Sequence, residues 1–205
     1  MDTDHEAPAG TVRTGGRTHR VRTAVLGAAL AELAEHGYAA LTVEQIARRS
    51  GIHKTTIYRR WQTKEAVLAA AVRDLADRIL PVQPTGQIDA DLRRISRGLI
   101  DVLDSDSPPV AGAVRTLFSE AIGHPAIAQL RHEFFARRHE DAQLMVAAAI
   151  DHGQLPSDTD ARELVGLVMA PIYYRFLVTG EQLNYEVADR AVEVALAAVR
   201  ASSQR

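Results

Sequence analysis

The stretch ARRSGIHKTTIYRRWQTKEAV, residues 47–67, places two short helical patterns on either side of Gly51. Ile57 and Trp61 are one helical turn apart, which predicts a buried face on the second pattern. The other side chains of that helix are polar or basic: Lys54, Thr55, Thr56, Tyr58, Arg59 and Arg60. A helix, a glycine-containing turn and a second short helix form the helix-turn-helix pattern, whose second helix enters the major groove of DNA.

Basic charge is concentrated in the same third of the chain. Residues 13–65 hold ten Lys and Arg side chains against four Asp and Glu side chains, although the whole chain carries a formal net charge of −2. This asymmetry favours contact with a polyanion, the alternative being a solvated basic face. Arg suits guanine edges, Thr suits thymine methyl groups or phosphates, and Tyr and Lys suit phosphates.

Apolar residues recur at three- and four-residue spacing along most of the chain, and alternating patterns typical of strands are absent. The sequence therefore predicts an all-α fold. Thr42 and Gln45 form a capping box at the start of the second helix, and Gly37 is expected to end the first. The predicted helices are 18–36, 42–50, 54–61, 64–80, 89–104, 109–122, 125–151, 161–179 and 185–201. Pro81, Pro84 and Gly86 are expected to end the fourth of them.

Composition excludes several classes of function. The 205 residues include no cysteine, so disulfides and thiolate chemistry are absent, in keeping with a cytoplasmic protein. Neither a signal peptide nor an apolar run of about 20 residues is present, so no membrane contact is expected. His132 and His139 lie about 10 Å apart on a helix, too far to share an ion. With no catalytic motif either, we expect no metal, no cofactor and no enzyme activity.

The stretch RTAVLGAALAELAEHGYAALTVEQIARRSGIHKTTIYRRWQTKEAV resembles the DNA-binding domain of the TetR family of bacterial transcriptional regulators. The features shared with that family are the Gly-aromatic pair before the Thr cap, the Ile-Ala of the second helix, the Gly-apolar turn, the Tyr of the recognition helix and the aromatic-x-x-Lys-Glu exit. The resemblance implies a flexible basic arm over residues 1–17 and a three-helix DNA-binding domain over 18–65. It further implies a C-terminal helical domain for ligand binding and dimerisation over 66–205.

The resemblance also implies which side chains meet DNA. Thr42, Tyr58 and Lys64 match positions that the family uses on phosphates. Bases are read mainly from the positions of Lys54, Thr55, Thr56, Arg59 and Arg60. His53 stands where the family often has Ser, so the third helix lacks a hydroxyl cap. Thr55 also departs from the common pattern, which leaves open which bases are read.

Two further groups of basic side chains have open roles. Arg17, Arg20 and Arg22 form either a minor-groove or phosphate arm or only the polar start of a helix. Arg48 and Arg49 contact DNA or are simply solvated.

The last two predicted helices have the composition of a dimer interface. Residues 161–180 are apolar nearly all round, which favours burial on one side by the core and on the other by a second subunit. Pro171 lies inside this helix, where a kink or local opening is expected. The family pairs these two helices with their copies, and a charge at Ala191 or Ala195 is expected to weaken such a homodimer.

Aromatic side chains cluster on the middle helices and on the helix that contains Pro171. With a few polar groups they have the composition of a small-molecule cavity, although a filled core is the alternative for each. The candidate ligand-binding residues are Arg115, Phe118, Phe134, Phe135, His139, Met169, Tyr173 and Tyr174.

The sequence thus predicts a homodimeric regulator that binds a palindromic double-stranded DNA operator. We expect a repressor released by a small hydrophobic ligand, because a ligand can release DNA only by preferring a conformation that binds DNA poorly. The alternatives are an activator or ligand-independent regulator, a helical protein-interaction module, and an enzyme built in the helical cavity.

Overall fold

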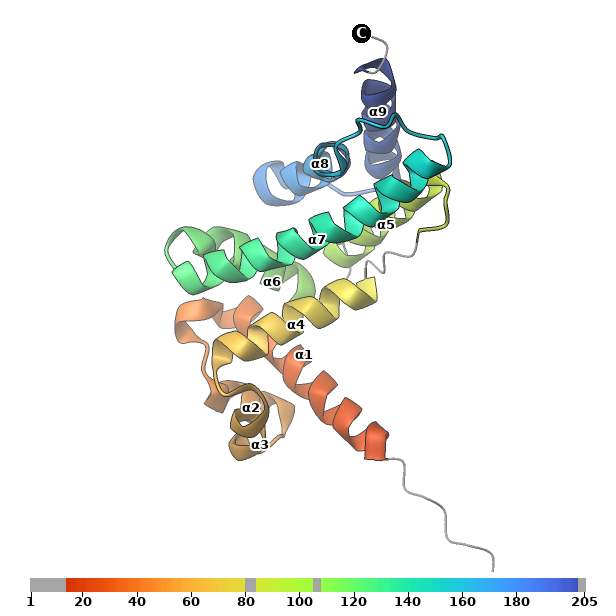
Figure 1. Ribbon diagram of the computed structural model, residues 1–205. Helices are drawn as coiled ribbons and strands as arrows, with labels where there is room; N and C mark the ends of the chain where they lie inside the picture. The colour runs from red at the N-terminus through yellow and green to blue at the C-terminus, as the bar shows by residue number, and fades with distance from the viewer. Residues whose placement is uncertain (1–13, 80–83, 105–107, 203–205) are drawn as a thin grey trace, which may run out of the picture.

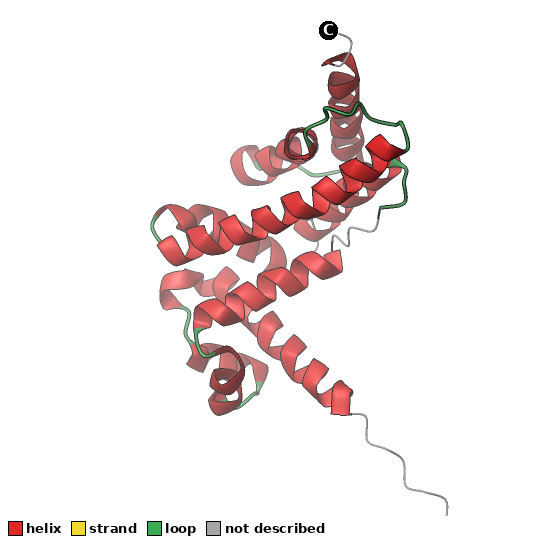
Figure 2. Ribbon diagram, in the orientation of Figure 1, coloured by secondary structure: helices red, strands yellow, loops and turns green. Residues whose placement is uncertain are grey.

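The computed structural model describes residues 14–79, 84–104 and 108–202, and within these ranges the secondary structure is entirely helical (Figure 2). The prediction of an all-α fold is confirmed. The first four helices lie at one end of the molecule and the last two at the other, with α7 between them (Figure 1). The bounds of the first four are α1 (Thr14–Ala40), α2 (Val43–Ser50), α3 (Lys54–Trp61) and α4 (Lys64–Ile79).

Local capping explains where α2 begins and ends. Thr42 has extended backbone angles (φ −136°, ψ 158°), and its hydroxyl accepts a hydrogen bond from the Gln45 N–H at 3.2 Å. Gly51 ends α2 in the left-handed region (φ 69°), which costs a glycine nothing. The side chain of His53 makes no capping hydrogen bond to α3, as its departure from the common hydroxyl predicts.

Helix α1 differs from its prediction at both ends. It begins at Thr14, so Arg17, predicted in a flexible arm, lies on the helix, while residues 1–13 of that arm lie outside the described residues. At its other end the helix is interrupted at Gly37 (φ 74°, ψ 172°) but resumes for one turn. The Tyr38 N–H donates to a carboxylate oxygen of Glu120 at 2.8 Å, so a residue of the C-terminal half satisfies the backbone after the interruption.

The C-terminal half contains five α-helices among the described residues, together with a short 3₁₀ turn and a π-helical turn. Their bounds are α5 (Ile88–Leu103), α6 (Pro108–Ser119), η1 (Glu120–Ile122), α7 (Pro125–Asp151), α8 (Ala161–Tyr174), η2 (Arg175–Thr179) and α9 (Tyr185–Ser202). Helix α8 continues through Pro171, where a kink or local opening was expected, as far as Tyr174. The π-helical turn η2 follows it, and there the Gly180 N–H donates to the Arg175 carbonyl at 2.8 Å. Pro81, expected to end α4, lies outside the described residues.

Two apolar cores hold these helices together. One joins α1–α4 and also takes in Ala113 of α6 and Ile127 and Leu130 of α7. The other joins α5 to α7, α8 and α9. Gly112 of α6 lies against Ala34 of α1, where an added Cβ would come within 2.7 Å of the Ala34 side chain. The N-terminal helices are therefore packed directly against α6 and α7.

Candidate nucleic-acid interface and ligand cavity

Helix α3 presents a polar outer face. Ile57 and Trp61 are 1% and 9% exposed and attach the helix to the N-terminal core. Lys54, Thr55, Arg59 and Arg60 are exposed, as is Tyr58 at 42%, while Thr56 is half-buried. The predicted burial of Ile57 and Trp61 is confirmed, and four of the five side chains predicted to meet bases are exposed.

The basic side chains of α3 are free to meet an anion. In the described part of the chain, neither Lys54 nor Arg59 forms an ion pair or a side-chain hydrogen bond. The Arg60 guanidinium lies 5.1 Å from the centre of the Trp61 ring and keeps its charge unpaired. Unpaired guanidinium and ammonium groups on an exposed helix are suited to phosphates and guanine edges.

Lys64 has internal partners instead. Its ammonium donates to the carbonyl oxygens of Tyr38 and Leu41, both at 3.0 Å, and lies 4.1 Å from the centre of the Tyr38 ring. The Tyr38 hydroxyl in turn donates to Glu65 at 2.6 Å. Two of the three N–H groups of Lys64 thus close the end of α1, and its phosphate contact stays a prediction that would use the third.

The other basic side chains divide into paired and exposed groups. Arg22 pairs with Asp74 of α4 at 3.2 Å, and Arg49 pairs with Glu32 at 2.6 Å and also with Glu35. Arg17 and Arg48 are exposed, and Arg20 donates only to the Gly16 carbonyl at 3.3 Å. Thr42, also a predicted contact, is exposed and uses its hydroxyl as the cap of α2.

A cavity of about 250 Å³ lies between α5, α7 and α8. Five predicted ligand-binding residues line it: Phe134, Phe135, His139, Met169 and Tyr173. Phe118 lines an adjoining apolar cavity of about 60 Å³ together with Phe134, Phe135 and Tyr173. Its ring centre is 5.9 Å from that of Phe135 and 5.4 Å from that of Tyr173. The predicted aromatic cluster therefore exists and leaves space between its rings.

Two predicted ligand-binding residues lie elsewhere. Tyr174 is 58% exposed on the outer face of α8, because consecutive helical residues point about 100° apart and Tyr173 occupies the inward position. Arg115 is exposed on α6, with its guanidinium 4.3 Å from the centre of the Phe176 ring. Neither residue lines the cavities formed by the aromatic cluster.

The prediction also missed wall residues of the cavity, above all Arg138. The α7 residues Phe134, Arg138, Ala142 and Met145 recur at spacings of four, four and three, as on a single helix face. That spacing could have identified Arg138, but a charged residue is expected outside a cavity by default. The other missed wall residues are Ile95, Leu99, Val165, Gly166 and Ala170.

Three polar side chains of the cavity wall are affected by burial. Burial lowers the pKa of Arg138, although its guanidinium lies 3.2 Å from Asp141. Burial raises the pKa of Tyr173 to about 12 and lowers the pKa of His139. The Nδ1 atom of His139 is buried and has no hydrogen-bond partner. A bound molecule could supply a partner for this Nδ1 atom, since unsatisfied buried polar atoms are costly.

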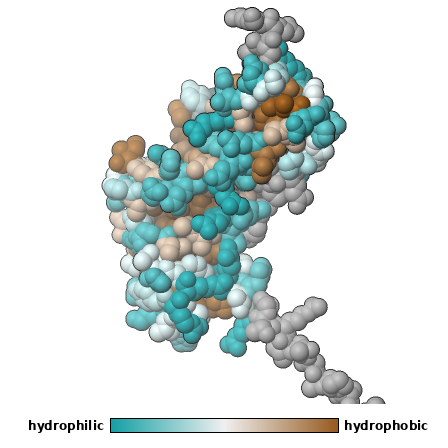
Figure 3. All heavy atoms as spheres, viewed as in Figure 1, coloured by the Kyte–Doolittle hydropathy of each residue, from teal (hydrophilic) through white to brown (hydrophobic). Residues whose placement is uncertain are grey.

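The outer surfaces of α8 and α9 form an apolar groove of about 800 Å³. Leu167 and Val194 are 43% and 56% exposed there. Figure 3 shows further hydrophobic surface on the face seen in that view, where the C-terminal part of α7 lies in front of α8 and α9. Ala191 and Ala195 are only 7% and 0% exposed in the single chain. A charge at either position would disturb the core of the protomer, so its effect would not report on the dimer interface alone.

The described residues contain no cluster of three or more potential metal ligands. Within the same residues, no helix combines the length and the apolar character needed to cross a bilayer.

An exposed basic recognition helix carried on a helical body defines a helix-turn-helix transcriptional regulator. Comparison with known proteins gives the family. Residues 25–71 match the family described as "Bacterial regulatory proteins, tetR family", and residues 82–195 match "Tetracyclin repressor-like, C-terminal domain". The chain belongs to the TetR family of bacterial transcriptional regulators, whose members are DNA-binding proteins and not enzymes.

Individual relatives cover nearly the whole chain. The HTH-type transcriptional regulator YdeS of Bacillus subtilis (strain 168) is 31% identical over 191 residues, with 91% of each chain covered. The solved TetR family regulator SCO0332 is 28% identical, with 87% of this chain and 97% of that chain covered and a TM-score of 0.69. TylP, a TetR regulator from Streptomyces fradiae, is 25% identical with a TM-score of 0.70, covering 89% of this chain and 88% of its own.

Proposed function

We propose that the protein is a homodimeric repressor that leaves its operator when a small, mainly hydrophobic ligand binds. The observation that carries this proposal is the pairing of two unfilled apolar features, an outer groove on α8 and α9 and an inner cavity between α5, α7 and α8. Exposure of an apolar groove to water is unfavourable, and a second copy of the chain can cover it. A two-fold dimer then presents two α3 helices to the two halves of a palindrome.

The packing of α4 supports a route from the cavity to DNA. Helix α4 follows α3 after two residues, and its Val72 and Ala76 line the small apolar cavity that Phe134 and Tyr173 also line. The larger cavity shares those same two aromatic walls. A ligand that separates the walls would therefore move α4, and with α4 the spacing between the two recognition helices of the dimer.

The proposal is tested with the full-length protein and a duplex carrying the inverted repeat found upstream of its own gene. Sedimentation should give a dimer at micromolar concentration, and fluorescence anisotropy should give salt-sensitive binding to the duplex. A thermal-shift screen of hydrophobic metabolites should find stabilising ligands. By reciprocity, a ligand that weakens operator binding tenfold must bind the operator complex tenfold more weakly, about 1.4 kcal/mol of coupling.

Three results would contradict parts of the proposal. A monomer at micromolar concentration would exclude the dimer, and equal affinity for operator and random duplex would exclude sequence-specific binding. Ligands that bind the free and the operator-bound protein equally would leave a ligand-independent regulator as the better account.

A further inference from the structure

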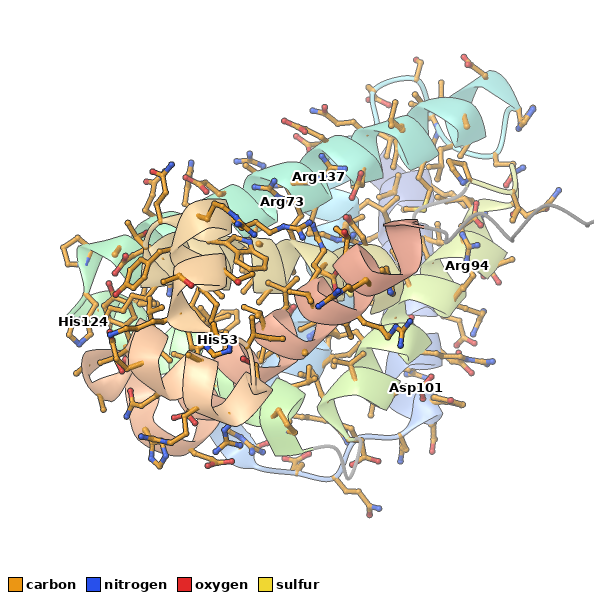
Figure 4. The ribbon with its side chains drawn as sticks, turned by 90° about the horizontal axis from the view of Figure 1, so that it is seen from below. His53, Arg73, Arg94, Asp101, His124 and Arg137 are labelled. Carbon is orange, nitrogen blue, oxygen red and sulfur yellow. The ribbon has the colours of Figure 1, made fainter. Side chains whose placement is uncertain are left out.

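A second, polar cleft adjoins the ligand cavity. It has a volume of about 330 Å³, lies between α4 and α7, and shares Phe134 and Arg138 with the cavity between α5, α7 and α8. Arg73 of α4 and Arg137 of α7 also line it, and Figure 4 shows these two labelled side chains next to each other where α4 faces α7. Arg138 therefore stands at the junction of an apolar cavity and a cleft that contains two more guanidinium groups.

Two arginines of this cleft have no ion-pair partner among the described residues. Neither Arg73 nor Arg137 forms an ion pair within the described part of the chain, although Asp77 and Glu133 line the same cleft. Glu133 instead accepts a hydrogen bond from Gln129 at 2.8 Å. Two guanidinium groups thus remain available beside a third.

Arg138 itself is largely buried. Its side chain is only 14% exposed and pairs with Asp141 at 3.2 Å. Burial nevertheless lowers its pKa, and the like charge of Arg137 acts in the same direction, while Asp141, Tyr173 and Asp77 oppose the shift. An added anion could therefore pair with Arg73 and Arg137 and lie beside the guanidinium group of Arg138.

We propose that the ligand is an amphipathic organic anion, with its apolar body in the cavity between α5, α7 and α8 and its carboxylate or phosphate oxygens on Arg138, Arg73 and Arg137. This inference rests on the proposed function, because it names the chemistry of that same ligand. The cavity walls are phenylalanine, methionine and leucine, which suit an alkyl or aryl body. The guanidinium groups suit an oxyanion, which they bind through charge-assisted hydrogen bonds.

The placement also gives the anion a mechanical role. Arg73 belongs to α4, the helix that follows the recognition helix, whereas Arg137 and Arg138 belong to α7. An anion that binds arginines of both helices would hold α4 close to α7. The apolar body beside Phe134 would contact the same two helices from the cavity side. Charge and shape together would then fix one position of α4.

The test compares carboxylates with neutral amides of the same shape, by isothermal titration calorimetry on the full-length protein. The probe pairs are 2-naphthoate with 2-naphthamide and decanoate with decanamide. We expect each carboxylate to bind at least about tenfold more tightly than its amide, because it gains charge-assisted hydrogen bonds. The proposal is wrong if no carboxylate binds more tightly than its amide, including the case in which no probe binds.

Variants locate the anion. Arg138→Met should lower carboxylate affinity about tenfold to a hundredfold and leave the affinity of any amide that binds unchanged, while Arg138→Lys should retain part of it. The exposed pair Arg73→Gln/Arg137→Gln, which keeps Arg138 and its fold, should lower carboxylate affinity by a smaller factor. Arg48→Met removes an exposed arginine of α2 and is the matched control, with no expected change. Unchanged carboxylate affinity in both the Arg138→Met and the Arg73→Gln/Arg137→Gln proteins would overturn the proposal.

Operator binding separates this inference from the proposed function. Amides that bind and release the operator as well as carboxylates do would keep the ligand-released repressor and overturn the anion site. Carboxylates that bind through Arg138 but leave operator affinity unchanged would keep the anion site and overturn release by such ligands.

Discussion

Helices α3 and α8 each bury one face and expose the other, and the difference between their exposed faces separates two kinds of partner. The exposed face of α3 carries Lys54, Tyr58 and Arg59, whereas that of α8 carries Leu167 and Tyr174. Exposed guanidinium and ammonium groups are well hydrated, so their exposure is not unfavourable and they are available to an anion. Exposure of leucine and tyrosine side chains to water is unfavourable, so these side chains favour contact with another apolar surface.

The surroundings of the two helices differ in the same sense. Ile57 and Trp61 fix α3 in a core shared with α1, α2 and α4. The inward side of α8 instead faces a cavity that Tyr173 and Met169 only partly fill. In the proposed function, α3 would read DNA from a closely packed position, whereas α8 would respond to a ligand beside unfilled volume. Unfilled volume permits the movement that close packing forbids.

The largest expected effect comes from placing a charge on the exposed face of α8. Leu167→Glu should raise the dimer dissociation constant at least about 100-fold, or about 2.7 kcal/mol, because the interface would remove a charged carboxylate from water. Analytical ultracentrifugation measures this. The matched control is Leu144→Glu on α7, where the leucine is 67% exposed outside the groove. Equal effects of the two changes would mean that the α8–α9 groove is not the dimer interface.

A second comparison contrasts two lysines of the DNA-binding region. Lys64→Met removes the hydrogen bonds to the carbonyls of Tyr38 and Leu41, so the free energy of unfolding should fall by about 1–3 kcal/mol. Lys54→Met should change stability by less than about 0.5 kcal/mol, because the side chain is exposed and unpaired in the described structure. Urea denaturation measures both.

The same two variants are then titrated with DNA at several salt concentrations. Loss of a phosphate contact should reduce the salt slope by about one. An unchanged slope for Lys64→Met would remove Lys64 from the DNA contacts and leave it a structural role only.

Base reading by α3 is tested through Arg59. If Arg59 meets a guanine, Arg59→Ala should lower the discrimination between operator and random duplex by about 1–3 kcal/mol. Arg48→Ala, on the exposed side of α2, should weaken both duplexes about equally if it contacts only phosphates. Anisotropy titrations of both variants on both duplexes decide the roles, and equal losses for Arg59→Ala would make Arg59 a phosphate contact.

Local sequence predicted most helix ends because most are set by local chemistry. The Thr42 cap and the Gly51 turn depend on residues within one turn of each other, and both are confirmed. The resumption of α1 after Gly37 depends on Glu120, which is 82 residues distant from Tyr38, so no local pattern could reveal it. Lys64 shows the same limit, since its carbonyl partners Tyr38 and Leu41 are 26 and 23 residues away in the sequence.

The sequence predicted which kinds of residue form the candidate ligand site, but not which helix face each residue occupies. Where a helix is apolar nearly all round, as α8 is, the sequence does not say which of two neighbouring tyrosines faces inward. Tyr173 and Tyr174 were therefore predicted together and are separated by the fold. Arg138 was missed for the opposite reason, because the burial of a charge depends on tertiary packing that brings α4, α7 and α8 together.

The smallest expected effects distinguish two tyrosines, one in each region. Burial, aided by the hydrogen bond to Glu65, raises the pKa of Tyr38 to about 12, and burial raises that of Tyr173 to about 12. A tyrosine is neutral when protonated, so the folded protein holds each proton more tightly than the unfolded chain does. The associated stability is present below pH 10 and is lost as pH rises from 10 toward 12.

Replacing each tyrosine by phenylalanine should therefore reduce the loss of stability at alkaline pH in both variants. At pH 7 the two variants should differ in their free energy of unfolding. Tyr38→Phe gives up the 2.6 Å hydrogen bond to Glu65 and should lose about 0.5–1.5 kcal/mol at pH 7. Tyr173→Phe should change stability at pH 7 by less than about 0.5 kcal/mol, because its hydroxyl has no hydrogen-bond partner among the described residues. Urea denaturation from pH 7 to about pH 11 measures both effects. A Tyr173→Phe protein that is destabilised as much as Tyr38→Phe at pH 7 would show that the cavity wall is as tightly bonded as the DNA-binding core, and the contrast between a rigid and a yielding region would fail.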